Sequence, residues 1–266
     1  MRGQPCLTAG YPEPYAATAD TYDRLARWAV AQWGESPRAH MVDFMQRLWS
    51  GRPTPVAQVL EVCCGTGLVL EQLRGRGYAV TGLDRSAAML AQARARLGPG
   101  VPLVRAELPD IPLAAGRFDA VVCPAAALNY MPDRAALRAT FDSVAAVLRP
   151  GGTFVFDLLS RGRLETGFAR VWAGDLGDLA FIWRFTHDPA GGHSDLAYTQ
   201  FLRRTGDHPP GYAATRELHR LYVLDRQVVR RAAAAAGFTD VAVWDNYSSR
   251  PAGATTDYET WTLTRP

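Results

Sequence analysis

The sequence predicts a doubly wound α/β fold, in which helices cover both faces of a mostly parallel sheet. Three observations carry this prediction: an apolar, β-branched run at 59–62, a glycine-dense turn that leads into an amphipathic helix, and a second apolar run at 79–84 that ends in an acid. A strand that is covered on both faces reads as a continuous apolar run. The order strand, turn, helix, strand is the repeating unit of such sheets.

Length and composition favour an enzyme-sized α/β domain with an insertion over two independent domains. The chain has 266 residues, 48% of them hydrophobic, which is enough to bury a full core. The formal net charge of +3 is too small to indicate a nucleic-acid partner. Because no apolar run approaches a membrane span and the N-terminus has no signal-like core, we expect no membrane partner and a cytoplasmic location.

The four cysteines do not form a metal-binding pattern. Cys63 and Cys64 are adjacent, Cys6 lies near the N-terminus, and Cys123 ends an apolar run. There is no CxxC pair and no matching histidine pair. We therefore expect no metal site, and thiols that pack as small apolar side chains.

Two helices are predicted ahead of the glycine-dense turn, between positions 15 and 49. In the second helix, apolar residues recur at the spacing of one helix face, and we expect this face to cap an edge of the sheet. The members of this stripe are Met41, Phe44, Met45, Leu48 and Trp49.

The turn after the first strand predicts a site for an adenosine-containing cofactor. Gly65 and Gly67 let the chain turn sharply while a ligand lies against the backbone, and the following helix directs its free N–H groups at that ligand. Asp84, at the end of the next strand, can accept hydrogen bonds from both ribose hydroxyls. A nicotinamide-binding turn would need a third glycine where Leu70 stands, so that pattern is excluded.

The segment from Glu61 to Gly67 resembles motif I of the class I S-adenosylmethionine-dependent methyltransferases, acid-x-Gly-x-Gly-x-Gly, with Cys63 in place of the first glycine. Cysteine is small enough to let the methionine part of the cofactor pass close. The segments that resemble the family's later strand ends follow in the family's order, at 83–90, 104–113, 118–130 and 148–158. The resemblance implies a Rossmann-like, seven-stranded sheet, with S-adenosylmethionine as cofactor and S-adenosylhomocysteine as product.

The resemblance also implies roles for individual residues. Asp84 would bind the ribose, Ser86 would cap the next helix, Met89 would pack toward the adenine, Glu107 would approach the adenine amino group, and Leu108 would cover the ring. The other cofactor contacts that it implies are Tyr15, Tyr22, Glu61, Cys63, Gly65, Gly67, Arg85 and Pro124. Tyr15 and Tyr22 belong to an N-terminal segment similar to the one that closes over the cofactor in small-molecule members of the family. The alternative for both tyrosines is that they anchor a helix.

An antiparallel meander of about three strands is predicted after the fifth strand of the sheet. The residues 179–187 alternate in polarity, a turn follows, and 194–203 and 213–222 again read as strands. A closing helix is expected from Asp225 to Gly237, and two strands, 241–247 and 258–264, complete the main sheet. One face of the meander carries Phe181, Trp183, Phe185 and His187, which either pack as core or, as we expect, roof the acceptor site.

These elements define the expected domain organisation. Residues 1–50 form an N-terminal helical lid, residues 51–160 and 225–266 form the cofactor-binding domain, and residues 161–224 form the inserted meander that covers the acceptor site.

Methyl transfer from S-adenosylmethionine needs little chemical assistance from the protein, because the sulfonium of the cofactor already activates the methyl group. The acceptor must be held in line with water excluded, and a hydroxyl or ammonium acceptor must also lose a proton. His219 and Tyr130 are the predicted catalytic residues, and His187 and Asp23 are further candidates to take the proton. For either histidine an ordinary surface or strand role is the favoured alternative, and a reaction without a general base stays open. The predicted acceptor-binding residues are Asn129, Tyr130, Trp183, His187 and His219.

We expect the acceptor to be a small-molecule metabolite, methylated on oxygen or nitrogen rather than carbon, and the composition is compatible with a tailoring step in natural-product biosynthesis. Amino-methyltransferases of nucleic acids carry Asp/Asn-Pro-Pro-aromatic after the fourth strand, where this chain has Cys-Pro-Ala-Ala at 123–126. The alternatives are a protein that binds the cofactor without transferring methyl, and a methyltransferase that acts on RNA or protein. The molecule is expected to be a monomer or a homodimer.

Overall fold

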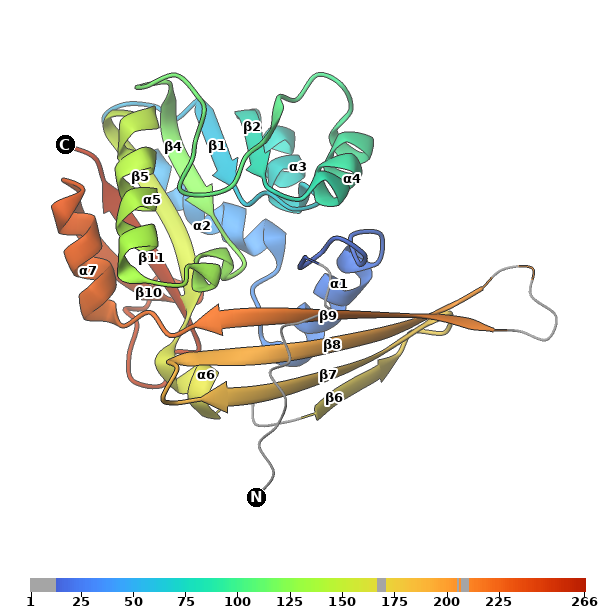
Figure 1. Ribbon diagram of the computed structural model, residues 1–266. Helices are drawn as coiled ribbons and strands as arrows, with labels where there is room; N and C mark the ends of the chain where they lie inside the picture. Colours follow the sequence, from blue (N-terminus) through green and yellow to red (C-terminus); the bar gives the residue numbers. More distant parts are fainter. Residues whose placement is uncertain (1–12, 167–170, 205, 207–210) are drawn as a thin grey trace.

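A computed structural model describes residues 13–166, 171–204, 206 and 211–266. Positions 1–12 of the predicted lid, with Cys6, lie outside the described residues. The chain folds into a main sheet with helices on both faces and a second, antiparallel sheet that lies beyond one end of it (Figure 1).

The main sheet has seven strands in the order β10-β11-β5-β4-β1-β2-β3. Strand β1 pairs in parallel with β2 and β4, and β11 runs antiparallel to its neighbours β5 and β10. The predicted doubly wound sheet is therefore confirmed. The bounds are β1 Gln58–Val62, β2 Ala79–Asp84, β3 Leu103–Arg105, β4 Phe118–Cys123, β5 Leu148–Leu159, β10 Thr239–Asp245 and β11 Tyr258–Thr264.

Helices cover both faces of this sheet. One face packs against α5 (Arg134–Val147) and α7 (Arg226–Ala235), and the other packs against α2 (Arg38–Ser50), α3 (Leu68–Gly75) and α4 (Ala87–Leu97). The expectation that the second helix caps a sheet edge is wrong. Its apolar stripe lies on the face, against residues of β1, β4 and β5, because a stripe this wide needs a flat apolar partner.

The inserted segment forms a sheet of four strands in the order β6-β7-β8-β9, one more than predicted. Their bounds are β6 Val171–Asp175, β7 Leu179–Asp188, β8 His193–Arg203 and β9 Tyr212–Tyr222. The additional strand, β6, is a short, half-exposed edge strand, so its sequence carries no strong strand pattern. Phe181 crosses over Gly174 of β6, where a Cβ atom would lie 2.5 Å from the Phe181 ring.

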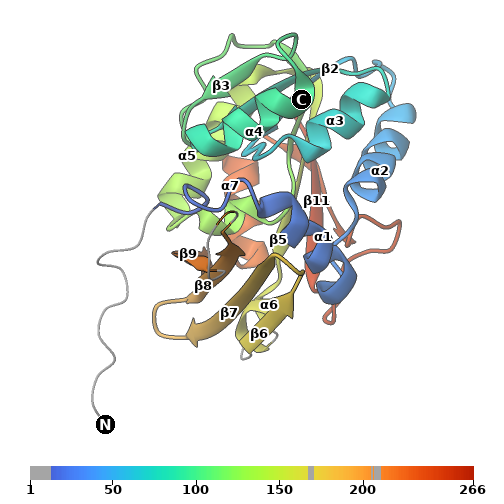
Figure 2. The same ribbon diagram turned by 90° about the vertical axis from the view of Figure 1, so that its right-hand side faces the viewer.

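The lid helix α1 (Tyr22–Trp33) lies between the main sheet and the second sheet, as both views show (Figures 1 and 2). Trp28 of α1 packs edge-on against Phe181 and Trp183, with ring centroids 4.8 and 5.3 Å apart. Three elements therefore surround the carboxyl ends of the main strands: the lid, the second sheet, and the 3-10 turn η1 (Ala127–Tyr130). Within the described residues, no helix combines the length and the apolar character that crossing a membrane requires.

Candidate functional site

Two adjoining cavities lie at the carboxyl ends of the main strands, where open α/β sheets bind ligands. The first cavity has a volume of about 290 Å³ and lies over the ends of β1, β2, β3 and β4. Ten of the twelve predicted cofactor residues line it: Tyr15, Tyr22, Cys63, Gly65, Asp84, Arg85, Met89, Glu107, Leu108 and Pro124.

Asp84 and Gly65 form the polar floor of the first cavity. One carboxylate oxygen of Asp84 accepts a hydrogen bond from the Gly65 N–H at 2.8 Å, and the other accepts one from the Ser86 N–H at 2.8 Å. Burial raises the pKa of Asp84, although these two hydrogen bonds oppose the shift. A Cβ atom at Gly65 would meet no atom of the protein within 4 Å, so the backbone is open to a ligand here. This cradle fits an adenosine ribose.

Apolar and charged side chains continue the lining beyond the ribose position. Ser86 caps α4 by accepting a hydrogen bond from the Met89 N–H at 3.3 Å, as predicted, and Met89 and Leu108 are buried. Arg85 pairs with Glu107 at 2.9 Å, which draws both side chains to the rim of the cavity. The combination of a flat apolar slot with a carboxylate at its edge suits a purine ring.

The backbone around the first cavity is strained. Cys63 has φ 56°, and Ala125 and Ala126, which follow β4, have φ 63° and 56°. These are left-handed values that favour glycine and are common at functional sites. Asp157 of β5 holds the second strained segment through a 2.6 Å hydrogen bond from the Ala126 N–H. Burial raises the pKa of the Asp157 carboxyl to about 7, because the side chain has no access to solvent.

The second cavity has a volume of about 150 Å³ and is walled mainly by apolar side chains of α1 and the second sheet. Trp183 and Phe185 of β7 lie in its lining, so the aromatic face of the insertion both packs on the lid and reaches this cavity. Four residues line both cavities: Tyr15, Tyr22, Ala125 and Tyr130. The two cavities therefore meet at these residues.

A chain of hydrogen bonds runs along the wall of the second cavity. The hydroxyls of Tyr15 and Tyr130 are 2.9 Å apart, the Tyr130 hydroxyl lies 2.8 Å from Nδ1 of His219, and Nε2 of His219 lies 3.2 Å from Oε2 of Glu217. A carboxylate only accepts hydrogen bonds, so Nε2 carries the proton and Nδ1 accepts from the Tyr130 hydroxyl. This arrangement can receive a proton from a group beside Tyr130.

Sequence reasoning missed Glu217, Glu35 and Arg38. Glu217 is fully buried in β9, and Glu35 and Arg38 form an ion pair in the lining of the second cavity. No local pattern marks any of the three: Glu217 reads like any polar position on an alternating strand, and Glu35 and Arg38 read like ordinary charged residues near the start of a helix. The roles of these three residues follow only from the residues that the fold places next to them.

Glu61 and Gly67 are predicted cofactor residues that lie outside both linings. Glu61 is 3% exposed, and burial raises its pKa while a hydrogen bond from the Leu70 N–H opposes that shift. A Cβ atom at Gly67 would lie 3.0 Å from Leu97 and 3.3 Å from Ala93 of α4. Gly67 is therefore a glycine that packs against a helix, and both residues support the turn from behind.

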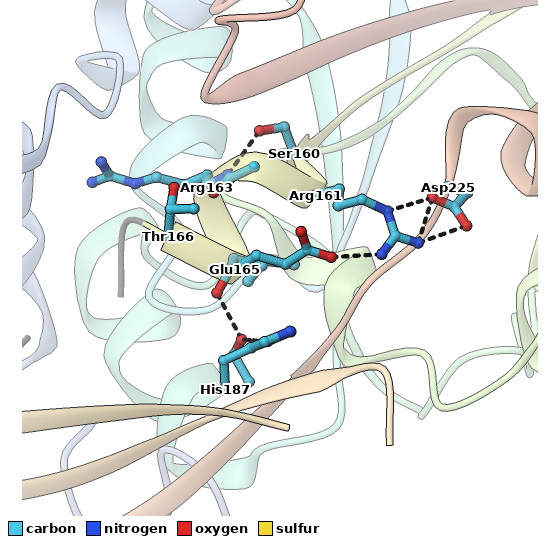
Figure 3. Close-up of polar contacts among 10 residues, drawn as sticks. Ser160, Arg161, Arg163, Glu165, Thr166, His187 and Asp225 are labelled. Carbon is cyan, nitrogen blue, oxygen red and sulfur yellow. Dashed lines mark hydrogen bonds and ion pairs between the residues drawn. The ribbon is translucent and has the colours of Figure 1, made fainter. Parts of the chain in front are cut away.

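Asn129 and His187, predicted to bind the acceptor, also lie outside both linings. The Asn129 amide joins η1 to two strand ends: it donates to the Tyr222 carbonyl at 3.0 Å and accepts from the Leu159 N–H at 2.9 Å. His187 lies beside α6 (Arg161–Thr166), where Nδ1 contacts Ser194 Oγ at 2.9 Å (Figure 3). Both side chains are used in contacts within the protein, so the prediction that they bind the acceptor does not fit their positions.

Asp23, the candidate base on the lid, ties α1 to the glycine turn. Its carboxylate accepts a hydrogen bond from Thr66 Oγ1 at 2.6 Å and pairs with Arg96 of α4. Arg96 also donates to the Thr66 carbonyl at 2.9 Å. Asp23 is thus fixed in a salt bridge away from the second cavity.

Comparisons with known proteins agree with this geometry. A family model described as a methyltransferase domain matches residues 59–152. The chain is 30% identical to the ubiquinone biosynthesis O-methyltransferase of Albidiferax ferrireducens, over 71% of this chain and 78% of that protein. It is 29% identical to the dTDP-3-amino-3,6-dideoxy-alpha-D-glucopyranose N,N-dimethyltransferase of Streptomyces fradiae, over 69% of this chain and 70% of that protein.

Among solved structures, the chain is similar to CalS10 with bound S-adenosylmethionine, an amino pentose methyltransferase of Micromonospora echinaspora involved in calicheamicin biosynthesis. The two share 28% identity and superpose with a TM-score of 0.73 over 92% of this chain and 97% of CalS10. The similarity therefore covers much more of the chain than residues 59–152, which the family model matches.

Proposed function

The chain belongs to the class I S-adenosylmethionine-dependent methyltransferases, and on this premise we propose that it methylates an oxygen or nitrogen of a small molecule held in the second cavity. One observation carries the proposal: Tyr130 lines both cavities, and its hydroxyl is hydrogen-bonded to His219. Methyl donor and acceptor must meet, and a residue that can relay a proton stands where the two cavities join.

We assign the cofactor to the first cavity. The Asp84 carboxylate would accept hydrogen bonds from the ribose hydroxyls, and Met89 and Leu108 would enclose the adenine. Gly65 leaves the space that the cofactor's approach to the backbone needs. Tyr15 and Tyr22 would close the opposite end, next to the second cavity.

When bound, S-adenosylmethionine supplies a methyl group that its sulfonium already activates. The protein's own residues then have three tasks: to orient the acceptor, to exclude water and to remove a proton. Trp183, Phe185 and Leu221 of the second sheet wall the second cavity and exclude water from it. Such enclosure also strengthens the polar contacts inside.

The proton leaves through Tyr130 and His219. The acceptor O–H or N–H donates to the Tyr130 oxygen, the Tyr130 proton passes to Nδ1 of His219, and Glu217 stabilises the imidazolium that forms. Burial raises the pKa of Tyr130, so its hydroxyl stays protonated. It therefore passes a proton on to His219 and does not remain as a phenolate. The proton that the acceptor loses therefore ends on His219.

The lining also supports a class of acceptor. Apolar residues make up most of the second cavity, and its one guanidinium, Arg38, is paired with Glu35. The enclosed part of the acceptor is therefore compact and largely apolar, with a hydroxyl or amine directed at Tyr130. A tailoring step in natural-product biosynthesis agrees with the role of CalS10, an amino pentose methyltransferase involved in calicheamicin biosynthesis.

A methyl-transfer assay tests the proposal. The protein is incubated with S-adenosylmethionine and a panel of phenols, amino sugars and hydroxylated metabolites, and products are sought by mass spectrometry as a gain of one methylene. With an acceptor found, Trp183→Ala should raise its KM at least about tenfold and leave cofactor affinity within about twofold. Cofactor binding without transfer to any panel member, in folded protein, would count against the proposal.

A further inference from the structure

We propose that Glu217 is a positioning residue that couples the lid to the proton acceptor: one carboxylate holds residues 15–18 over both cavities and fixes the orientation of His219. The inference rests on the proposed function for its catalytic meaning. The link that Glu217 makes between the lid and the imidazole of His219 rests only on contacts within the chain.

On the lid side, Glu217 accepts three hydrogen bonds. The donors are the N–H groups of Tyr15 and Ala17 and the hydroxyl of Thr18, each 2.9 Å from a carboxylate oxygen. Glu217 is 0% exposed and Thr18 is 3% exposed. Hydrogen bonds to a buried charged group are among the stronger ones in proteins, so they hold this segment firmly.

The other end of the same segment is tied to the cofactor turn. Asp23 pairs with Thr66 and Arg96, as described above. Tyr15 stands at the first attachment and Tyr22 next to the second, and both tyrosines line the two cavities. A segment tethered at both ends therefore forms a wall shared by the two cavities, and Glu217 is its anchor on the second sheet.

On the base side, the same carboxylate faces the imidazole of His219, which is 4% exposed. Burial raises the pKa of Glu217, but hydrogen bonds from His219 and from the N–H groups of Ala17 and Tyr15 outweigh it, so the pKa is lowered overall. Glu217 is thus an ionised acceptor. It holds the proton of His219 on Nε2 and leaves Nδ1 to accept from Tyr130.

The two roles depend on each other because they share one carboxylate. If residues 15–18 moved away, Glu217 would keep one donor of four, and a buried carboxylate with so few partners is unstable. The other titratable groups that face His219 are tyrosines: Tyr15 from the lid, Tyr130 from η1 and Tyr198 from β8. Among these groups, Glu217 is the ionised one, and it contacts the Nε2 side of the imidazole.

Two measurements on the full chain test this coupling without any acceptor. Calorimetry gives the affinity for S-adenosylhomocysteine, and ¹⁵N spectra of histidine-labelled protein give the tautomer of His219, whose signal is identified by its loss in His219→Gln. The variants are Glu217→Gln, Thr18→Val and His219→Gln. Glu259→Gln is the matched control, since Glu259 is also buried but pairs with Arg226 of α7.

Glu217→Gln should weaken S-adenosylhomocysteine binding at least about tenfold and release His219 from the Nε2–H tautomer. Thr18→Val should weaken binding while the tautomer stays, and His219→Gln should leave affinity within about twofold. Glu259→Gln should change neither. Wild-type affinity and an unchanged tautomer in Glu217→Gln would overturn the inference.

Turnover separates this inference from the proposed function. With an acceptor in hand, Glu217→Gln should lower kcat at saturating cofactor at least about tenfold and move the pH at which activity is half-maximal, which a purely structural residue would not do. If no acceptor were methylated while Glu217→Gln still changed affinity and tautomer, the proposed function would fail and the coupling would stand. Loss of affinity with an unchanged pH profile would overturn the catalytic part.

Discussion

Gly65 and Gly67 stand in one turn, yet their surroundings differ. A Cβ atom at Gly65 would point into open space beside the first cavity, while one at Gly67 would crowd Leu97 and Ala93. Gly65→Ala should therefore weaken S-adenosylhomocysteine binding at least about tenfold, because the methyl occupies cofactor space. Both positions have a positive φ, 53° at Gly65 and 79° at Gly67, but only Gly67 is also crowded, so Gly67→Ala should lower the free energy of unfolding by about 2 kcal/mol, more than Gly65→Ala does. Calorimetry and urea titration of both variants check this contrast, and the reverse pattern would contradict it.

Asp84 gives a second prediction for a single residue. Asp84→Asn should weaken cofactor binding by about 1.5–3 kcal/mol, because the amide keeps one acceptor but loses the charge that strengthens bonds from the ribose hydroxyls. Asp142→Asn on α5, where the carboxylate pairs with the exposed Arg138, is the control. An Asp84→Asn protein with wild-type affinity in calorimetry would place the ribose elsewhere.

The sequence alone predicts the positions of some site residues and not of others. Asp84 ends β2 and Gly65 lies just after β1, each within a short local pattern, and ten predicted cofactor residues line one cavity. Glu217 could not be found this way, because its lid partners are about two hundred positions away in the chain. Asn129 was assigned to the acceptor from its position after a strand, and that position does not show that its amide is taken up by two backbone groups.

At the level of elements, Asp157 ties β5 to the strained segment after β4 and makes stability depend on pH. Its pKa is about 7 in the folded protein and about 3.9 when unfolded, so between these values the folded state binds more protons. Its contribution is therefore fully present below about pH 4 and is lost as the pH rises through 7.

Asp157→Asn stays neutral and keeps an acceptor for the Ala126 N–H. Relative to wild type, this variant should gain up to about 4 kcal/mol of stability between pH 4 and pH 8. Urea unfolding of both proteins across that range measures the difference. A difference that does not change with pH would show that Asp157 ionises normally in the folded state.

His187 contributes to the contacts that attach α6 to the second sheet. Ser194 Oγ donates to the Leu164 carbonyl at 2.9 Å and contacts His187 at 2.9 Å, and Arg161 of α6 pairs with Asp225 before α7 (Figure 3). His187→Ala should lower the free energy of unfolding by about 1 kcal/mol and leave the acceptor KM unchanged. A KM raised tenfold in a stable variant would return His187 to the acceptor site.

Elements with strong patterns were predicted, and weak ones were not. The alternating strands β7, β8 and β9 and the continuous strands of the main sheet match their sequence patterns. Strand β6 was not predicted, because a five-residue edge strand forms through its pairing with β7 and not through a strand-like composition of its own. The stripe on α2 showed that one face is buried but not which surface covers it.

Across the whole molecule, the lid and the second sheet close the carboxyl ends of a common nucleotide-binding sheet (Figures 1 and 2). The main sheet supplies the first cavity, and the second cavity exists only where α1, η1 and the second sheet come together. The cofactor side was therefore open to prediction from local motifs. The acceptor side depends on contacts between segments that are distant in sequence, so only its general position was predicted.

The central claim is that Tyr130 relays the acceptor's proton where the two cavities meet, and Tyr130→Phe tests it most directly. The phenyl ring preserves the packing and removes the hydroxyl that contacts His219 and Tyr15. We predict that kcat for the identified acceptor falls at least about a hundredfold while S-adenosylhomocysteine affinity stays within about threefold. Tyr78→Phe, whose ring packs on Trp49 away from the cavities, should match wild type. A Tyr130→Phe enzyme with wild-type kcat would contradict the account.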